Sequence, residues 1–153
     1  MTLVLSPSDF VACIHHAQKV WKRCLDAPEE FRTLSTEVGS LQHVLGEVQE
    51  SVCGHELNQR SKSDLRQLIA GCDEVLMELQ RIFDKHKRWS SQSKRSWNRL
   101  SLGKDPVERI RQRVIAMIGL LDAFNVSFVR YVLSGFAIWH GECLLTILQR
   151  QPS

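Results

Sequence analysis

Glycine and proline are scarce in this chain, and the common nucleotide-binding signatures are missing. Only eight glycines and four prolines occur among 153 residues, whereas an all-β fold needs many turns and therefore more of both. The sequence contains neither a GxxxxGK[ST] loop nor a GxGxxG motif, so it offers no nucleotide site of a recognisable kind. No internal repeat is visible either. These absences favour a helical protein without nucleotide chemistry of its own.

Metal-binding and catalytic patterns are also absent. A zinc site needs cysteines and histidines clustered at short spacings, and the nearest groups are Cys13 with His16, and Cys53 and His55 with His43. Neither group has a second half at the right spacing. We therefore expect no metal and no cofactor.

Nucleophilic catalysis would need a serine or cysteine beside a histidine base and an orienting acid. The six histidines are scattered, and no such set stands out. We read Asp73, Glu74 and Glu78 as a solvated helix face rather than a di-metal site, because such sites need inward-facing Glu-x-x-His pairs. The sequence thus predicts no enzyme, no catalytic residues and no small-molecule substrate.

The cysteine count and the start of the chain point to the cytoplasm. Five cysteines are an odd number, and residues 1–5 are too short and lack the basic start of a secretory signal peptide. Cys24 and Cys72 fall on apolar helix stripes, and Cys13 lies beside one. We expect reduced, buried thiols in an intracellular protein.

Four stretches carry apolar residues at alternating spacings of three and four, which places each set on one stripe of an α-helix. Four such stripes can bury one another and form a bundle core. The stripes are Phe10, Ile14, Ala17, Trp21 and Cys24; Phe31, Leu34, Val38, Leu41, Leu45, Val48 and Val52; Leu65, Leu68, Cys72, Val75, Leu79 and Ile82; and Val107, Ile110, Val114, Met117, Leu121, Phe124 and Phe128.

Capping residues and prolines predict where the helices begin. Ser6 or Ser8 precedes the first helix as N-cap, and Pro28 suits the first turn of the second. Residues 61–64 resemble a capping box for the third helix, expected over 62–88. A short helix is expected over 94–102, and Asp105 with Pro106 opens the last helix.

The end of the last helix has a different pattern. From Val126 to Leu148 apolar residues surround the helix on nearly all sides, so this segment needs cover from protein or lipid. One helix reaching Arg150 would be roughly 65 Å long and would overhang its neighbours; any break is expected at Gly135 or Gly141. Three kinds of cover stay open, namely packing within the domain or a dimer, reversible membrane contact, and a membrane span. The candidate association or membrane surface is Phe128, Tyr131, Phe136 and Trp139.

Positive charge is concentrated before the last helix. Residues 85–113 carry 10 basic and 2 acidic side chains, whereas residues 1–84 carry 8 basic and 13 acidic ones. Such a segment can bind an anionic partner, with lipid and single-stranded nucleic acid as the alternatives, or lie against acidic faces of the earlier helices. We favour the structural or partner-facing interpretation. The candidate anionic-surface contacts are Lys87, Arg88, Lys94, Arg95, Trp97 and Arg99.

Several segments resemble a known family in order and spacing. The run DAPEEFRTLSTEVGSLQHVL at residues 26–45 resembles the second helix of the HeLo-like N-terminal domains of fungal STAND receptors, the NLR-like proteins with a NACHT or related NTPase. The resemblance covers roughly residues 8–127 and includes GCDEVL (71–76), SKRSWNRL (93–100), IRQRVI (110–115) and LLDAFN (120–125). It implies a helical signalling or effector module whose relatives execute programmed cell death in non-self recognition. No NTPase region follows in this sequence, so we expect the front module alone.

The sequence therefore predicts an all-α fold, an antiparallel bundle of four main helices plus one short helix. The bundle spans 1–127, and an apolar extension of the last helix spans 128–153. We expect a non-enzymatic signalling or interaction module that associates with a protein partner or itself, with membrane contact as a further candidate and no nucleic-acid partner. It would be cytoplasmic or peripheral at a membrane. The alternative is a passive scaffold that dimerises or binds a protein without membrane activity.

Overall fold

The structure is a computed structural model of the chain, and its described part consists of helices joined by short turns. It describes the backbone of residues 6–90 and 104–149, and the side chains of residues 6–29, 31–85 and 106–136. Within these ranges there is no strand, so the all-α prediction is confirmed. The expected short helix over 94–102 lies outside the described residues. The helices are α1 (Pro7–Leu25), α2 (Glu29–Arg32), α3 (Ser35–Val52), α4 (Gln59–Ser90) and α6 (Lys104–Gln149).

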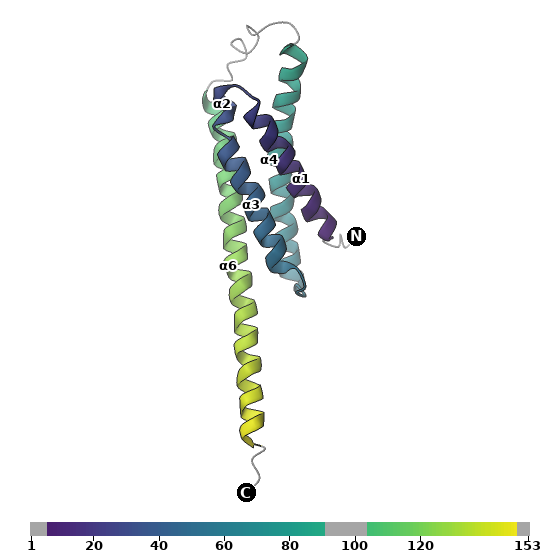
Figure 1. Ribbon diagram of the computed structural model, residues 1–153, viewed down its shortest axis with the longest axis vertical. Helices are drawn as coiled ribbons and strands as arrows, with labels where there is room; N and C mark the ends of the chain where they lie inside the picture. The colour runs from purple at the N-terminus through teal and green to yellow at the C-terminus, as the bar shows by residue number, and fades with distance from the viewer. Residues whose placement is uncertain (1–5, 91–103, 150–153) are drawn as a thin grey trace.

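The four long helices alternate in direction along the chain (Figure 1). α1 and α4 run upward in that view, and α3 and α6 run downward. α1 packs against α3 and α4, and α6 packs against the same two helices. The consecutive helices α3 and α4 therefore lie on a diagonal of the bundle, with only slight contact, and the neighbouring helices α3 and α6 run parallel to each other.

The apolar stripes form one core, with corrections on α4 and α1. On α4, the predicted Leu68 and Ile82 are only half-buried, whereas Ile69 and Phe83 beside them are buried. The α3 stripe is buried as predicted from Leu34 to Val48. On α1, however, the fully covered row runs through Cys13 and Val20, while Ile14 and Trp21 pack half-buried at its edge. Both rows share Phe10, Ala17 and Cys24 and have the same 3–4 spacing. Contact with two neighbouring helices, which spacing does not encode, selects the row that faces inward.

Two of the predicted helix starts need correction. Ser6 caps α1 as expected, with Asp9 completing a capping box. α4 begins three residues before the expected start, because the side chain of Asn58 accepts from the Ser61 N–H at 2.8 Å and acts as the cap. The expected second helix is interrupted where the Leu34 N–H bonds to the Phe31 carbonyl at 3.0 Å. This tighter i→i−3 bond separates α2 from α3.

α6 is far longer than its partners. Its 46 residues correspond to roughly 69 Å, and its lower half extends past the ends of α3 and α4 (Figure 1). The helix continues through Gly135 and Gly141, so the break expected there does not occur. One further turn of backbone hydrogen bonds at each glycine outweighs the roughly 1 kcal/mol that glycine costs in a helix.

Candidate interaction surface

The last residue of α6 that the bundle covers is Phe128. Its ring is 6 % exposed and meets the His55 ring edge-on, with centroids 5.8 Å apart. It also stacks with Phe124 at 6.2 Å. His55 lies in the turn between α3 and α4, so this contact closes the lower end of the bundle. The structure thus places Phe128 inside the fold rather than on the candidate surface.

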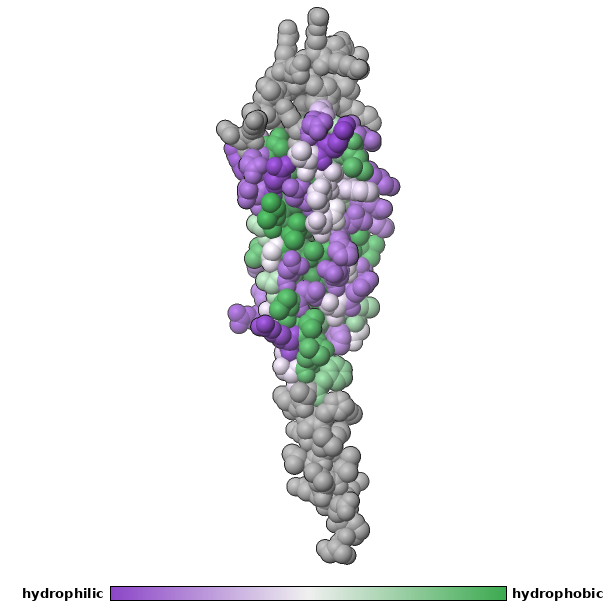
Figure 2. Space-filling view, turned by 60° about the vertical axis from the view of Figure 1, so that its left-hand side comes forward, coloured by the Kyte–Doolittle hydropathy of each residue, from purple (hydrophilic) through white to green (hydrophobic). Residues whose placement is uncertain are grey.

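On both sides of Phe128 along the chain, α6 exposes large apolar side chains. Tyr131, Leu133 and Phe136 are 65 %, 62 % and 54 % exposed, and Val126 and Val129 are 51 % and 41 % exposed. Figure 2 shows hydrophobic side chains gathered at the lower end of the described surface. Contiguous exposed apolar patches mark interaction sites more often than isolated ones do. We name four of these residues, Val126, Val129, Leu133 and Phe136, which share one side of α6, the α6 patch; Tyr131 lies on the nearly opposite side.

The same helix satisfies a simple test for a membrane span. Over Pro106–Phe136 it is long and apolar enough to cross a bilayer, and only 17 % of the relevant window is buried in the bundle. Length and composition alone are weak evidence, since core helices of water-soluble proteins pass the same test. Of the predicted surface residues, Tyr131 and Phe136 are exposed, and Trp139 lies in α6 with its side chain outside the described residues.

The predicted anionic-surface residues fall largely beyond the description. Lys87 and Arg88 lie on the last turns of α4, where only the backbone is described, and Lys94, Arg95, Trp97 and Arg99 lie outside the described residues.

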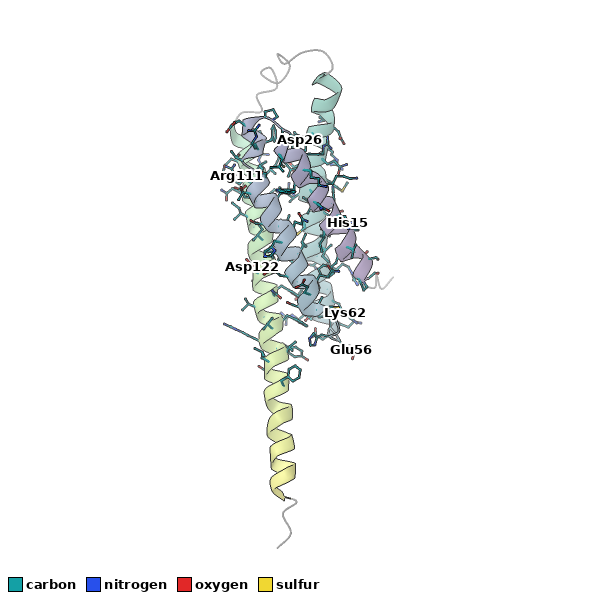
Figure 3. All side chains as sticks on the ribbon, in the orientation of Figure 1. His15, Asp26, Glu56, Lys62, Arg111 and Asp122 are labelled. Atoms are coloured by element: carbon teal, nitrogen blue, oxygen red, sulfur yellow. The ribbon has the colours of Figure 1, made fainter. Side chains whose placement is uncertain are left out.

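The positive segment also contributes Arg109, Arg111 and Arg113 to the start of α6, and the last two pair with acids. Arg111 contacts Glu37 of α3 at 3.1 Å, near the top of the bundle (Figure 3). Arg113 pairs with Glu78 and with Glu74 of α4, the latter at 3.6 Å. For these two side chains, packing against acidic faces of earlier helices is confirmed.

The acidic face of α4 is therefore not simply solvated, which corrects the sequence interpretation. Asp73 accepts from His16 Nδ1 of α1 at 2.6 Å, while His16 Nε2 lies 2.8 Å from Gln80. Further along, Arg23 of α1 pairs with Asp84 at 2.8 Å. These contacts join α1 to α4 and use both nitrogens of the one histidine that bridges helices there.

The thiols are poor nucleophiles where they are buried. Burial raises the pKa of Cys13, Cys24 and Cys72 from 9.0 to about 12, with nearby acidic or thiol groups adding to the rise. Cys53 is exposed. Within the described residues, no three or more His, Cys, Asp or Glu side chains gather as metal ligands would.

Sequence reasoning missed one cavity. It has a volume of about 330 Å³ and lies between the first turn of α1 and the turn that joins α3 to α4. Its lining includes Phe10, Val52, Leu57 and Lys62. No sequence signal marks it, because its residues come from three separate segments.

Comparison with known families decides which class of domain this bundle represents. A family model described as the N-terminal domain on NACHT NTPases and P-loop NTPases, SesA, matches residues 8–117. The chain belongs to the SesA family. This confirms the expected relation to NACHT-associated N-terminal domains. No curated protein and no solved structure matches the chain.

The match to SesA ends at Met117, part-way along α6. It includes α1 from its second residue, all of α2, α3 and α4, and Arg111 and Arg113. The α6 patch lies beyond the matched residues. The matched residues thus form most of the bundle, which also buries Leu121 and Phe128, and the patch is carried by the segment that follows the match.

Proposed function

We propose that this SesA domain is a non-enzymatic signalling module of the kind that precedes the NTPase in fungal NLR-like receptors, with a HeLo-like effector role. It acts by helix association. It serves the same process as its relatives, which is cell death in non-self recognition. The family assignment supports an N-terminal NLR-like domain in general. A cytoplasmic location, at times peripheral to a membrane, fits this role.

The α6 patch is the observation that carries the proposal. Apolar side chains in contact with water are unfavourable, and their burial drives association. Leu133 and Phe136 remain 62 % and 54 % exposed in the single chain, on the part of α6 that extends beyond the bundle. Association through the patch gives these side chains the cover that the bundle does not supply.

Expression in fungal cells tests the signalling role. We expect the wild-type chain, produced from an inducible promoter, to reduce viability, and Leu133→Asp to abolish this effect at equal protein level. An equally toxic Leu133→Asp variant contradicts association through the patch. Unchanged viability with the wild-type chain contradicts the effector role and favours the passive scaffold.

Membrane contact is a second candidate, favoured by the length and apolar character of Pro106–Phe136. Co-sedimentation with phosphatidylcholine vesicles, with and without phosphatidylserine, tests it. We expect binding that depends on the anionic lipid and that falls when Lys94, Arg95 and Arg99 are replaced by glutamate. No sedimentation with either vesicle, or binding unaffected by the charge reversal, removes this candidate.

A further inference from the structure

In addition to the row that packs in the bundle, α6 carries a second row of residues, which is exposed and apolar in its second half. The residues at positions 119, 122, 126, 129, 133 and 136 alternate in spacing between three and four, as in a coiled-coil seam. At 100° per residue, this row lies roughly 120° around the helix from the buried row that contains Ile110, Val114 and Leu121. All six side chains are exposed. We name the row the exposed seam; it consists of Gly119, Asp122, Val126, Val129, Leu133 and Phe136.

The sequence around the exposed seam is self-complementary about Val126. Four residues before this valine stands Asp122, and four residues after it stands Arg130. Both are exposed, and neither finds an ion-pair partner among the described residues. Figure 3 shows Asp122 half-way down α6.

Side-chain size follows the same symmetry. Three large exposed residues on or beside the seam after Val126 correspond to small exposed residues at the same distance before it. A small residue opposite a large one lets two helices approach and interlock. The matching pairs are Ala116 with Phe136, Gly119 with Leu133, and Ala123 with Val129.

The length of α6 has the same centre. The helix extends from Lys104 to Gln149, so its midpoint lies between residues 126 and 127. An antiparallel pair of these helices centred on Val126 would overlap along its full length. The part that projects from one bundle would then lie along the first half of α6 in the other copy.

We propose that two copies of the chain pair through the exposed seam, with their α6 helices antiparallel about a twofold axis at Val126. The inference rests on the proposed association and names its partner and register. A twofold interface brings residue i of one copy to residue j of the other and j to i, so Asp122 meets Arg130 of the second copy twice. A parallel pair would instead place Asp122 against Asp122 and Arg130 against Arg130, which like-charge repulsion disfavours.

A charge exchange tests the register. Asp122→Arg and Arg130→Asp, each alone, should weaken dimerisation at least tenfold in sedimentation equilibrium, because each creates two like-charge contacts. The double variant D122R/R130D should return the dissociation constant to within about threefold of the wild-type value. A dimer whose affinity the double variant fails to restore overturns the antiparallel register, and a wild-type chain that stays monomeric at 100 µM overturns the dimer itself.

A matched pair of variants tests which face of α6 forms the dimer interface. Leu133 and Tyr131 are similarly exposed, at 62 % and 65 %, but they lie roughly 160° apart around α6. Leu133→Asp should dissociate the dimer, while Tyr131→Asp should leave the mass unchanged, with both variants keeping wild-type helicity by circular dichroism. Equal effects of the two variants contradict the seam. A dimer with this behaviour that has no effect on fungal viability leaves the interface in place and contradicts the signalling role alone.

Discussion

At the scale of single residues, Arg111 links α6 to α3 and to the residue that ends α2. Its guanidinium pairs with Glu37 of α3 and with Glu108 of its own helix, and it donates to the hydroxyl of Thr33. The Arg111 and Glu37 side chains are only 25 % and 23 % exposed. A largely buried ion pair stabilises a fold only where its geometry is good, and the loss of one partner leaves the other charge unsatisfied.

Replacement of Arg111 by methionine should therefore destabilise the bundle. We expect a loss of about 1–3 kcal/mol in the free energy of unfolding, because the Glu37 carboxylate then stays partly buried without a partner. Glu37→Gln in the same chain should recover part of this loss. Urea unfolding of the wild type, the two single variants and the double variant measures the coupling. Additive effects would show that the two side chains do not stabilise each other.

The buried thiols give a second residue-scale prediction. Because burial raises the pKa of Cys13, Cys24 and Cys72 to about 12, the reactive thiolate is almost absent at pH 8. In a Cys143→Ser background, Ellman's reagent should label Cys53 at once and the other three thiols only after unfolding. Labelling of all four at similar rates would contradict the buried arrangement.

The same shifts give the pH dependence of stability. In the unfolded chain these thiols ionise near pH 9, whereas in the fold they stay protonated to about pH 12. The unfolded state therefore releases more protons above pH 9. We expect the thiol contribution to stability to be constant below pH 9 and to fall between pH 9 and 12, as measured by urea midpoints. The triple variant with serine at the three positions should lack this part of the decline.

At the scale of the helices, the sequence predicted the presence and the alternating direction of the long helices better than their exact boundaries and buried rows. The stripe on α3 was correct because only one row of that helix is apolar. On α1 two rows are apolar, and contacts with α3 and α4 decide between Val20 and Trp21. The separation of α2 from α3 coincides with an i→i−3 hydrogen bond at Leu34, which has no sequence signature.

The candidate site was found only in outline for a similar reason. Apolar residues all around the end of α6 indicated a segment in need of cover, but they did not show which side the bundle would take. The contact of Phe128 with His55 fixes the rotation of α6, and only then do Leu133 and Phe136 separate from the buried row. A periodicity of three and four is common to both rows, so tertiary contacts were needed to tell them apart.

Two glycines of α3 give a matched prediction at this scale. A Cβ added at Gly46 meets nothing within 4 Å, whereas one added at Gly39 lies 3.2 Å from Trp21 Nε1. Gly46→Ala should stabilise the protein by up to about 1 kcal/mol, because alanine favours the helix. Gly39→Ala should gain less, because the indole of Trp21 must shift. Thermal unfolding compares them, and an equal gain at both positions would contradict the close packing of Trp21 on α3.

At the scale of the whole molecule, the fold is a closed bundle with one helix, α6, that the other helices cover only in part. Cross-helix contacts join α1 to α4 through His16 and Arg23, and α6 to α3 and α4 through Arg111 and Arg113. The family match covers the part that is closed in this way. The lower half of α6 projects from the bundle, and any partner that covers this half sets the shape of the assembly.

A distance measurement between the two bundles of a dimer distinguishes the ways of covering α6. The contact between Arg111 and Thr33 places the α2 end of the bundle about 15 residues from Val126 along α6. In the antiparallel dimer the two α2 ends point in opposite directions, and their separation along the axis is roughly 45 Å. In a parallel dimer the two α2 ends lie at the same position along the axis and are separated only by the width of the bundles.

Glu29, which is 88 % exposed, can carry the probe as Glu29→Cys in a chain with Cys53→Ser and Cys143→Ser. Double electron–electron resonance of the spin-labelled dimer should give one long distance of at least about 45 Å, and Leu133→Asp in the same chain should remove the signal by dissociating the pair. A short distance that persists in that variant would mean that the copies meet through a surface other than α6.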